Sequence, residues 1–554
     1  MTMDAMRAPD WWQTGVVYQI YPRSFADTNG DGLGDLAGII DHLDHLNGAP
    51  GALGIDAIWL SPIYPSPDFD FGYDVADYVD VDPRYGTLRD FDRLVAEAHA
   101  RGIRVVLDLV LNHTSHLHPW FQASRSDPTG PYGDWYLWRD PAPGSTPAHR
   151  IQPNNWRSFF GGEGWTWDEI RGQFYFHTFA AEQPEVNWRS PGVRAAMLDV
   201  IRTWLDRGVD GFRLDVFNVF FKDAELRSNP EQPGTDPWSR QIHVHDRNQP
   251  ELLDFLREMR ALVDEKPGRM TVGELFDGTA ADAADLVVPR HLVFDWAAIF
   301  LPWNATAFRA AIAAREAVFG RGRWPANALS NHDQPRQASR FDVPGSGVGG
   351  AGDARAKVAA AALLTLRGTP FLYFGEEIGQ RNISVPREQA FDPFARHAEP
   401  SRDVFNRDEC RGPIAWDGDA PGFGFSAGTP WLPMSPDAPV RNVVAQAGDP
   451  GSVLSWYRQL LAFRRTTPAL QRGAQELVEC GDADVFGYIR EASDAGRAFI
   501  ALNFADRLIA IVLPEAPGGH GWRVGLSTHA RMGSEELAGT VTLEPYEALI
   551  AVEA

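Results

Sequence analysis

The chain has 554 residues, a formal net charge of −23 and a hydrophobic content of 44%. This length exceeds one ordinary domain and allows a large buried core. The acidic balance excludes a nucleic-acid partner, because phosphate binding needs a basic surface. Only Cys410 and Cys480 are present, which excludes a disulfide framework and a cysteine-rich zinc site. No stretch approaches the ~18 apolar residues of a membrane span, and no apolar leader is evident, so we expect a cytoplasmic protein without a membrane partner.

Short apolar runs alternate with helix-like segments through the first two-thirds of the chain. Helical periodicity is clear in Leu88–Arg101 and Pro191–Arg207. Eight strands alternating with helices indicate an α/β protein with a (β/α)8 TIM barrel, whose chemistry lies at the carboxyl ends of the strands. The predicted strands are Val16–Tyr21, Ala57–Leu60, Arg104–Asp108, Gly211–Leu214, Thr271–Gly273, Leu292–Phe294, Ala328–Ser330 and Thr369–Phe374.

Two long excursions and a change of pattern interrupt this alternation. Residues 113–187 are rich in Trp, Gly, Pro and Asn and are too long for a normal connection, so they predict an inserted subdomain above the active face. A second excursion, from about Gln380 to Gly451, follows the eighth strand. From residue 475, short alternating runs predict an antiparallel β-domain over 475–554. Residues 1–112 and 188–474 would then form the barrel.

Three acidic residues, Asp215, Glu274 and Asp333, each follow a short apolar run. A carboxylate costs several kcal/mol to bury unless it is paired or functional. One such acid is as often an ordinary helix N-cap. Three acids that converge on the strand ends of one barrel instead predict a site that stabilises positive charge.

Such a pattern suits glycoside hydrolysis with retention of configuration. That reaction needs a nucleophilic carboxylate and a protonated acid about 5 Å apart around an oxocarbenium-like transition state. Arg213 lies two residues before Asp215, on the same face of its strand, so its charge is expected to keep Asp215 ionised. Glu274 follows an apolar run, and desolvation is expected to raise its pKa and suit it to donate a proton.

Five motifs lie at or beside the predicted strand ends: Asp108-Leu-Val-Leu-Asn-His113, Gly211-Phe-Arg-Leu-Asp215, Gly273-Glu274, Asn331-His-Asp-Gln-Pro-Arg336 and Gly368-Thr-Pro370. With these motifs the chain resembles the α-amylase family of glycoside hydrolases, specifically its oligo-1,6-glucosidase and α-glucosidase branch. The resemblance extends from Val17 to Tyr546. It implies that Asp215 is the nucleophile, Glu274 the general acid and base, and Asp333 the carboxylate that binds sugar hydroxyls.

The resemblance also implies a set of sugar contacts. His113 and His332 would hydrogen-bond the glucose next to the scissile bond, although a single histidine is more often structural. The segment Pro67–Asp74 matches one that supplies an acid and an aromatic floor, at Asp70 and Tyr73. Arg411 matches an arginine that binds the far hydroxyls with that acid and closes the cleft into a pocket; a surface ion pair is the alternative. The expected substrate-binding side chains are Asp70, Tyr73, His113, Arg213, His332 and Arg411.

A few positions differ from the branch. Glu185 and Val186 replace Asp and Leu, Phe374 stands where Gln is common, and residues 412–415 replace Thr-Pro-Met-Gln. In the resembled branch the residue after the nucleophile correlates with the bond cleaved, valine with α-1,6 and alanine or threonine with α-1,4. Val216 therefore predicts a slight preference for α-1,6 bonds; alternatively, this valine only ends a strand.

The run from Asp27 to Asp35 places oxygen ligands at alternate positions with a glycine at the sixth. The twelfth position is Gly38 rather than Glu, so the run is not a complete EF-hand loop. The resembled branch holds Ca²⁺ or Mg²⁺ here, which implies a structural ion; a solvated acidic turn is the alternative. The implied ligands are the side chains of Asp27, Asn29, Asp31 and Asp35 and the carbonyl of Leu33.

The resemblance implies an exo-acting, retaining α-glucosidase for short gluco-oligosaccharides, without an organic cofactor. A transglucosidase is one alternative, because both reactions share a covalent glucosyl-enzyme. A non-catalytic relative, like the ancillary subunits of some amino-acid transporters, is another. Those subunits carry a membrane anchor and have lost catalytic carboxylates, whereas this chain keeps Asp215, Glu274 and Asp333.

Overall fold

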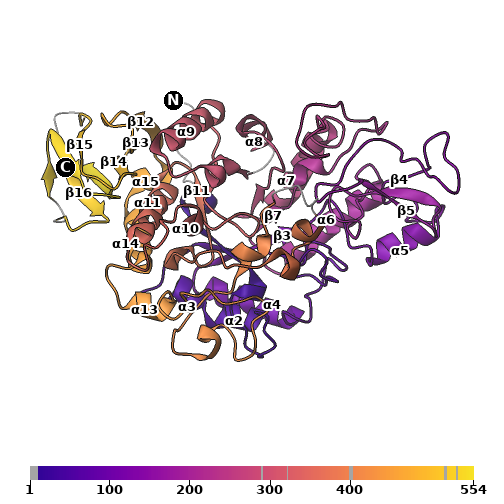
Figure 1. Ribbon diagram of the computed structural model, residues 1–554, viewed down its shortest axis with the longest axis horizontal. Coiled ribbons are helices and arrows are strands. Elements are labelled where there is room, and N and C mark those ends of the chain that lie inside the picture. Colours follow the sequence, from indigo (N-terminus) through magenta and orange to yellow (C-terminus); the bar gives the residue numbers. More distant parts are fainter. Residues whose placement is uncertain (1–9, 288–290, 321, 398–403, 517–520, 532–534) are drawn as a thin grey trace.

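The computed structural model describes residues 10–287, 291–320, 322–397, 404–516, 521–531 and 535–554. A closed barrel of parallel strands forms its centre (Figure 1). The predicted (β/α)8 barrel is confirmed. Around the barrel the strands follow the order β1 (Val17–Ile20), β11 (Thr369–Tyr373), β10 (Ala326–Ala328), β9 (Leu292–Asp295), β8 (Met270–Gly273), β7 (Gly211–Leu214), β3 (Arg104–Leu109) and β2 (Ala57–Leu60).

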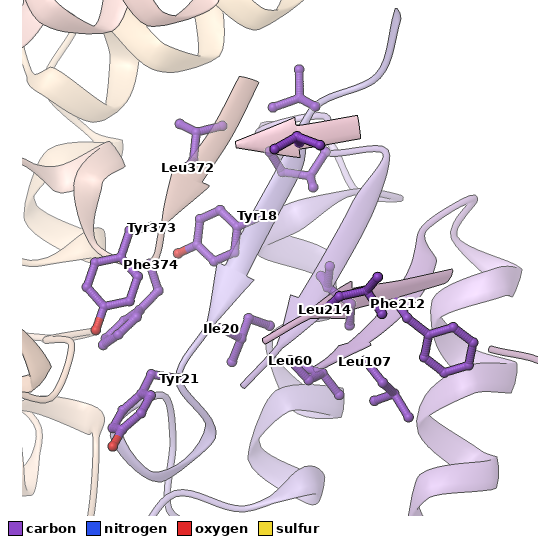
Figure 2. Close-up of a cluster of buried hydrophobic side chains, with 14 of the residues drawn as sticks. Tyr18, Ile20, Tyr21, Leu60, Leu107, Phe212, Leu214, Leu372, Tyr373 and Phe374 are labelled. Carbon is purple, nitrogen blue, oxygen red and sulfur yellow. The ribbon is translucent and has the colours of Figure 1, made fainter. Parts of the chain in front are cut away.

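Side chains along each strand alternate between the surrounding helices and the inside of the barrel. The outward set packs into the main core and includes Tyr18, Ile20, Leu60, Leu107, Phe212, Leu214 and Leu372 (Figure 2). Positions between them join a second cluster, made mostly of strand residues, with Val17, Trp59, Val106, Val272 and Phe371. Arg213 lies between the outward residues Phe212 and Leu214, so its side chain points into the barrel. Its guanidinium lies 5.2 Å from the ring centroid of Trp59. A charge at this place needs charged partners.

Strand β10 starts at Ala326 rather than at the predicted Ala328. The strand includes Asn327, a buried amide. Its Oδ1 accepts a hydrogen bond of 2.6 Å from Arg315, and its Nδ2 donates one of 3.1 Å to the carbonyl of Arg367. Since both polar functions are paired, the strand tolerates this residue. Asp333 consequently lies on the loop beyond the strand rather than directly at its end.

Helices surround the barrel (Figure 1). The two predicted helices are present as α4 (Leu88–Ala100), which begins at a capping box of Thr87 and Asp90, and α6 (Pro191–Asp206), which begins with a proline. In the described ranges no helix is long and apolar enough to cross a bilayer. Other helices are α1 (Trp11–Thr14), α2 (Leu36–Asp41), α3 (Leu43–Leu46), α7 (Glu251–Asp264), α8 (Ala280–Val287), α9 (Ala305–Phe319), α10 (Gln337–Arg340), α11 (Ala351–Thr365), α12 (Pro393–His397), α13 (Val443–Ala447), α14 (Val453–Thr466) and α15 (Pro468–Arg472).

The long segment between β3 and α6 carries structure of its own. It contains α5 (Pro119–Ser126) and a three-stranded sheet of β4 (Trp138–Arg139), β6 (Gln173–Phe176) and β5 (Trp165–Asp168). This region projects to one side of the barrel (Figure 1). Its aromatic core includes Leu137, Trp156, Trp165, Phe174 and Phe176. An aromatic core explains why the segment is rich in tryptophan.

The predicted antiparallel β-structure at the C-terminal end is confirmed (Figure 1, yellow). A six-stranded sheet has the order β12 (Ala474–Val478), β13 (Val485–Ala492), β14 (Gly496–Asn503), β19 (Ala548–Glu553), β16 (Trp522–Ser527) and β17 (Glu536–Leu537), beside the pair β15 (Ile509–Val512) and β18 (Thr540–Leu543). The runs predicted from the sequence are Asp484–Arg490, Ala498–Phe504, Ile509–Leu513, Thr540–Leu543 and Ala548–Val552, so β12, β16 and β17 were missed. The start of β16, Trp522-Arg-Val, alternates buried and exposed residues and is a signal that could have found it.

Candidate active site

The three acids predicted from the sequence lie together at the carboxyl end of the barrel. Asp215 follows β7, Glu274 follows β8, and Asp333 lies on the loop after β10. All three line one cavity of about 480 Å³. The barrel thus brings them together from three separate segments. Active sites of (β/α)8 barrels lie at this carboxyl end of the strands.

Arg213 connects the carboxylates from inside the barrel. Its Nη1 lies 2.7 Å from Oδ1 of Asp108 and 2.8 Å from Oδ1 of Asp215. Its Nη2 donates to Oε2 of Glu274. The registers of β3, β7 and β8 produce this meeting, because Asp108 pairs with Arg213 and Leu214 pairs with Gly273. One buried guanidinium therefore holds three carboxylates in fixed positions.

The protonation of this cluster differs from the expectation. Burial raises the pKa of Asp215, and the charges of Glu274 and Asp108 add to that effect while Arg213 opposes it. Arg213 therefore lowers the pKa of Asp215, as predicted, but burial outweighs its effect. Burial also raises the pKa of Glu274, as predicted, and raises that of Asp108 to about 6. Arg213 contacts both Asp215 and Glu274, which places the two carboxyl groups beside each other, as a retaining pair requires.

Asp333 is held in the ionised form. Its Oδ1 lies 2.7 Å from Nη2 of Arg411 and 3.2 Å from Nη1 of Arg407. Burial opposes ionisation, but the surrounding cationic groups hold the pKa of Asp333 well below its usual range. Burial lowers the pKa of the adjacent His332 to about 3, so this histidine is neutral near pH 7 and the two arginines supply the charge.

The arginine that pairs with Asp70 is Arg407, not Arg411. Nη2 of Arg407 lies 2.7 Å from Oδ1 of Asp70 and 2.7 Å from Oδ1 of Asp392. Arg411 is fully buried, donates to the carbonyl of His332 at 2.8 Å, and does not line the cavity. Both arginines belong to the 3-10 helix η7 (Arg407–Arg411), and only the first faces the cavity. The prediction that Arg411 pairs with Asp70 is therefore wrong.

Asp70 is positioned by its own loop and by the inserted region. Both backbone amides of Phe69 and Asp70 donate to the Asp74 carboxylate at 3.0 Å. Gln183, a residue that sequence reasoning did not assign to the site, contacts Oδ2 of Asp70 and Nε2 of His113, each at 3.2 Å. The inserted region therefore closes one wall of the cavity with a polar side chain.

Tyr73 and His332 form a second fixed unit. Their rings stack with centroids 5.4 Å apart, and the tyrosine hydroxyl lies 2.6 Å from Nε2 of His332 and 3.0 Å from Oδ2 of Asp108. Nδ1 of His332 lies 2.8 Å from Nε2 of Gln19, an amide donor, so the proton of the neutral ring is on Nε2. Tyr73 lines the cavity, whereas His332 lies behind it.

Val216 has a left-handed backbone, with φ of 33°. That conformation is rare for a β-branched residue and costs conformational energy. Its side chain packs with Phe160 and Phe179 and lines the cavity, and its N–H lies 3.4 Å from Oε2 of Glu274. Of the predicted residues, those on the cavity surface are Asp70, Tyr73, His113, Asp215, Val216, Glu274 and Asp333, and those behind it are Arg213, His332 and Arg411.

In the Asp27–Asp35 loop, side-chain oxygens accept hydrogen bonds from backbone amides. Asp27 accepts from the amides of Gly30 and Gly32 at 2.8 Å, and Asp31 accepts from that of Leu33 at 2.8 Å. The Asp27 oxygens also accept from the amide of Asn29 and the hydroxyl of Ser426, so all four of its lone-pair sites are used, whereas Asp31 keeps further lone pairs. Within the described residues, no three His, Cys, Asp or Glu side chains are grouped to hold a metal. An ion here would therefore depend on Asn29 and the Leu33 carbonyl as well.

Comparison with known proteins agrees with this geometry. The family profile described as alpha amylase, catalytic domain, matches residues 19–473. A protein of Rhizobium meliloti (strain 1021) named probable alpha-glucosidase is 44% identical, with 93% of each chain covered. An oligo-1,6-glucosidase of Parageobacillus thermoglucosidasius is 36% identical, with 98% of each chain covered. The crystal structure of an alpha-glucosyl transfer enzyme, XgtA, has 38% identity and a TM-score of 0.89, covering 99% of this chain and 100% of that one. The chain therefore belongs to the α-amylase family of glycoside hydrolases.

Proposed function

We propose that the protein is an exo-acting, retaining α-glucosidase that releases glucose from the non-reducing end of short α-gluco-oligosaccharides. The observation that carries the proposal is the pair Asp215 and Glu274, held by Arg213 on the surface of one cavity. The Asp70–Arg407 ion pair in the cavity wall supports an exo mode, because a closed end admits only a chain terminus.

The reaction divides into two displacements. Asp215 attacks the anomeric carbon and forms a carbon–oxygen bond while the glycosidic bond breaks, and the proton of Glu274 passes to the departing oxygen. The Glu274 carboxylate then takes a proton from water, whose oxygen attacks the same carbon and releases Asp215. Two inversions retain the α-configuration. Since Asp215 must be ionised to attack, the proton is on Glu274, whose pKa burial raises.

The polar side chains of the cavity bind the terminal glucose. Asp333 and Asp70 accept hydrogen bonds from its hydroxyls, and Arg407 donates between these two carboxylates. Tyr73 forms the floor under the ring, and His113 lies beside it. Because Arg407 and Arg411 keep Asp333 ionised, it stabilises the positive charge that develops on the sugar.

The proposal is tested with isomaltotriose labelled at its reducing end. An exo-acting enzyme releases unlabelled glucose and a labelled disaccharide, and early proton NMR spectra show α-glucose. Labelled glucose as the first product contradicts the exo mode, and initial β-glucose contradicts retention.

Linkage preference is the finer part of the proposal. We assign a slight α-1,6 preference to Val216, whose side chain lines the cavity directly after the nucleophile. Transglucosylation is a second candidate, favoured by the similarity to a structure named alpha-glucosyl transfer enzyme. The ratio of transfer product to free glucose at high substrate concentration distinguishes it from hydrolysis.

A further inference from the structure

The chain makes a tight turn directly after Asp215. Val216 has a left-handed backbone with φ of 33°, and the amide of Val219 donates to the carbonyl of Val216 at 3.0 Å. A β-branched residue keeps such a conformation only where the surrounding structure holds it there. The side chains that hold this turn therefore also determine where the Asp215 carboxylate lies.

Asn218 joins the turn to the loop that carries Glu274. Its Oδ1 accepts a hydrogen bond of 2.8 Å from the amide of Phe276, and its Nδ2 donates one of 3.0 Å to the carbonyl of the same residue. Asn218 is fully buried, so water does not compete for these bonds. Phe276 lies two residues after Glu274. One amide side chain thus links the loop of the nucleophile to the loop of the proton donor.

Lys222 joins the same turn to the inserted region. Its Nζ donates to the carbonyl of Val219 and lies 2.6 Å from Oε2 of Glu185. The two charged side chains are 0% and 1% exposed. Oε1 of Glu185 accepts from the amide of Thr178 at 2.7 Å, so the carboxylate is fixed on the inserted region as well. Either charge without the other would be costly at this buried place, and the pair therefore holds the two segments together.

Both anchoring side chains lie behind the cavity. Asn218 and Lys222 are buried, and the cavity surface over them is formed by Val216 and by Phe276. The anchors therefore act on the reaction through the backbone that carries the two carboxylates, without contact to the sugar.

From these contacts we infer that Asn218 and Lys222 are positioning residues for the reaction. Asn218 sets the turn after Asp215 against the loop of Glu274. Lys222, through its ion pair with Glu185, sets the same turn against the inserted region. This inference rests on the proposed α-glucosidase function and adds to it two residues that place the reacting groups.

Two measurements separate the placement of the carboxylates from the binding of glucose. The value of kcat/KM on isomaltose depends on attack by Asp215, whereas the inhibition constant of free glucose depends on the groups that bind the terminal sugar. Of these groups, Asp70 and Asp333 are held by Arg407, from a separate segment. Loss of an anchor is therefore expected to lower kcat/KM while the glucose inhibition constant changes by less than about threefold. A purely structural role lowers the melting temperature and leaves kcat/KM of the folded protein unchanged.

Lys222→Met removes the charge and keeps the length of the side chain. It is expected to reduce kcat/KM on isomaltose by about tenfold to a hundredfold, because small displacements of reacting groups are costly. Since this change leaves Glu185 as an unpaired buried charge, the double variant Lys222→Met/Glu185→Gln is measured as well and is expected to show the same loss. The matched control is Lys266→Met. Nζ of Lys266 lies 2.5 Å from Asp206, but these side chains are 40% and 72% exposed, so kcat/KM is expected to match wild type.

Asn218→Leu keeps the approximate volume of the side chain and removes its hydrogen bonds. The change displaces Glu274 relative to Asp215, so a substrate whose leaving group needs a proton is affected more. We expect kcat/KM to fall by at least about tenfold more on isomaltose than on 4-nitrophenyl α-glucoside, whose leaving group departs with little help from an acid. In the Lys222 variants the two substrates are expected to lose activity by similar factors, because the nucleophile serves both.

Asn47→Leu is the matched control for the asparagine. Asn47 donates to the carbonyl of Arg101 at 2.9 Å, in the connection that leads into β2, and its loss is expected to leave both kcat/KM values at the wild-type level. Circular dichroism and thermal unfolding show whether each variant is folded. If Asn218→Leu does not fold, Asn218→Ala, which removes the same hydrogen bonds with less bulk, is measured in its place.

The outcomes are separable. Wild-type kcat/KM in the folded Asn218 variant or in the folded Lys222→Met/Glu185→Gln protein overturns the inference. A glucose inhibition constant that rises by the same factor as kcat/KM falls also overturns it, because the anchors would then maintain the whole cavity. Equal losses on the two substrates in the Asn218 variant contradict its role between the two carboxylates. If wild type hydrolyses neither isomaltose nor 4-nitrophenyl α-glucoside, the proposed function itself fails.

Discussion

Arg407 and Asp70 form an ion pair of 2.7 Å that joins η7 to the loop after β2 in the wall of the cavity. The same guanidinium contacts Asp333 at 3.2 Å and Asp392 at 2.7 Å. Three carboxylates thus surround one cation, and both its charge and its planar shape maintain their positions.

Arg407→Lys is expected to reduce kcat/KM on isomaltose by about tenfold to a hundredfold, because an ammonium cannot hold three carboxylates in place and small displacements are costly in catalysis. The matched control is Arg189→Lys, at a largely exposed ion pair with Glu251. Steady-state kinetics measure the effect. Wild-type kcat/KM in Arg407→Lys contradicts a role for this arginine in the site.

Asp215→Asn and Glu274→Gln are expected to fold normally and lose activity by several orders of magnitude, as covalent catalysts do without a nucleophile or proton donor. Added azide distinguishes the two roles on an activated aryl α-glucoside. With Asp215→Ala it gives a β-glucosyl azide by one displacement, and with Glu274→Ala an α-glucosyl azide through the covalent intermediate. NMR of the products determines the anomeric configuration of the azide. If Asp215→Ala gives the α-azide and Glu274→Ala the β-azide, the two residues have the opposite roles.

Glu376 provides a test of pH-dependent stability. Burial raises its pKa to about 8, from an ordinary value of ~4.3. Between these two values the folded state keeps a proton that the unfolded state has lost, so the free energy of unfolding falls as pH rises and then levels above about pH 8. Glu376→Gln removes this contribution. We expect the melting temperature of wild type to fall more between pH 5 and pH 8 than that of the variant; parallel curves contradict the raised pKa.

Removal of divalent cations is expected to lower the melting temperature more than the initial rate, because the Asp27–Asp35 loop carries no cavity residue. An ion that binds only the folded state stabilises it by about 2.7 kcal/mol at a hundred times its dissociation constant. Added calcium or magnesium should restore the melting temperature of wild type but not that of Asp31→Ala. Asp31 lies at an exposed position of the loop. An unchanged melting temperature after verified metal removal contradicts a stabilising ion.

The linkage preference is tested at Val216 through the ratio of isomaltose to maltose kcat/KM. Val216→Thr keeps the branched shape and the strained backbone, with φ of 33° in wild type, whereas Val216→Ala removes volume. We expect the ratio to shift toward maltose in both. If wild type prefers maltose and neither substitution moves the ratio, Val216 does not select the bond.

The sequence by itself determined the barrel and its three acids. Apolar residues at alternate positions, such as Tyr18 and Ile20, show which face of a strand is buried in the core. The parallel strands of a barrel have their carboxyl ends on the same side. Asp215 and Glu274 could therefore be placed together before any contact was known.

Only the tertiary structure decided which side chains meet across these loops. Whether Arg407 or Arg411 faces Asp70 depends on the course of η7, which no local pattern encodes. The cavity lining likewise brings together Phe159, Phe276 and Phe394 from segments far apart in the chain. Local sequence preferences specify strands and helices, whereas contacts between distant loops arise from the packing of the whole chain. That packing also decides which charged groups are buried and how their pKa values shift.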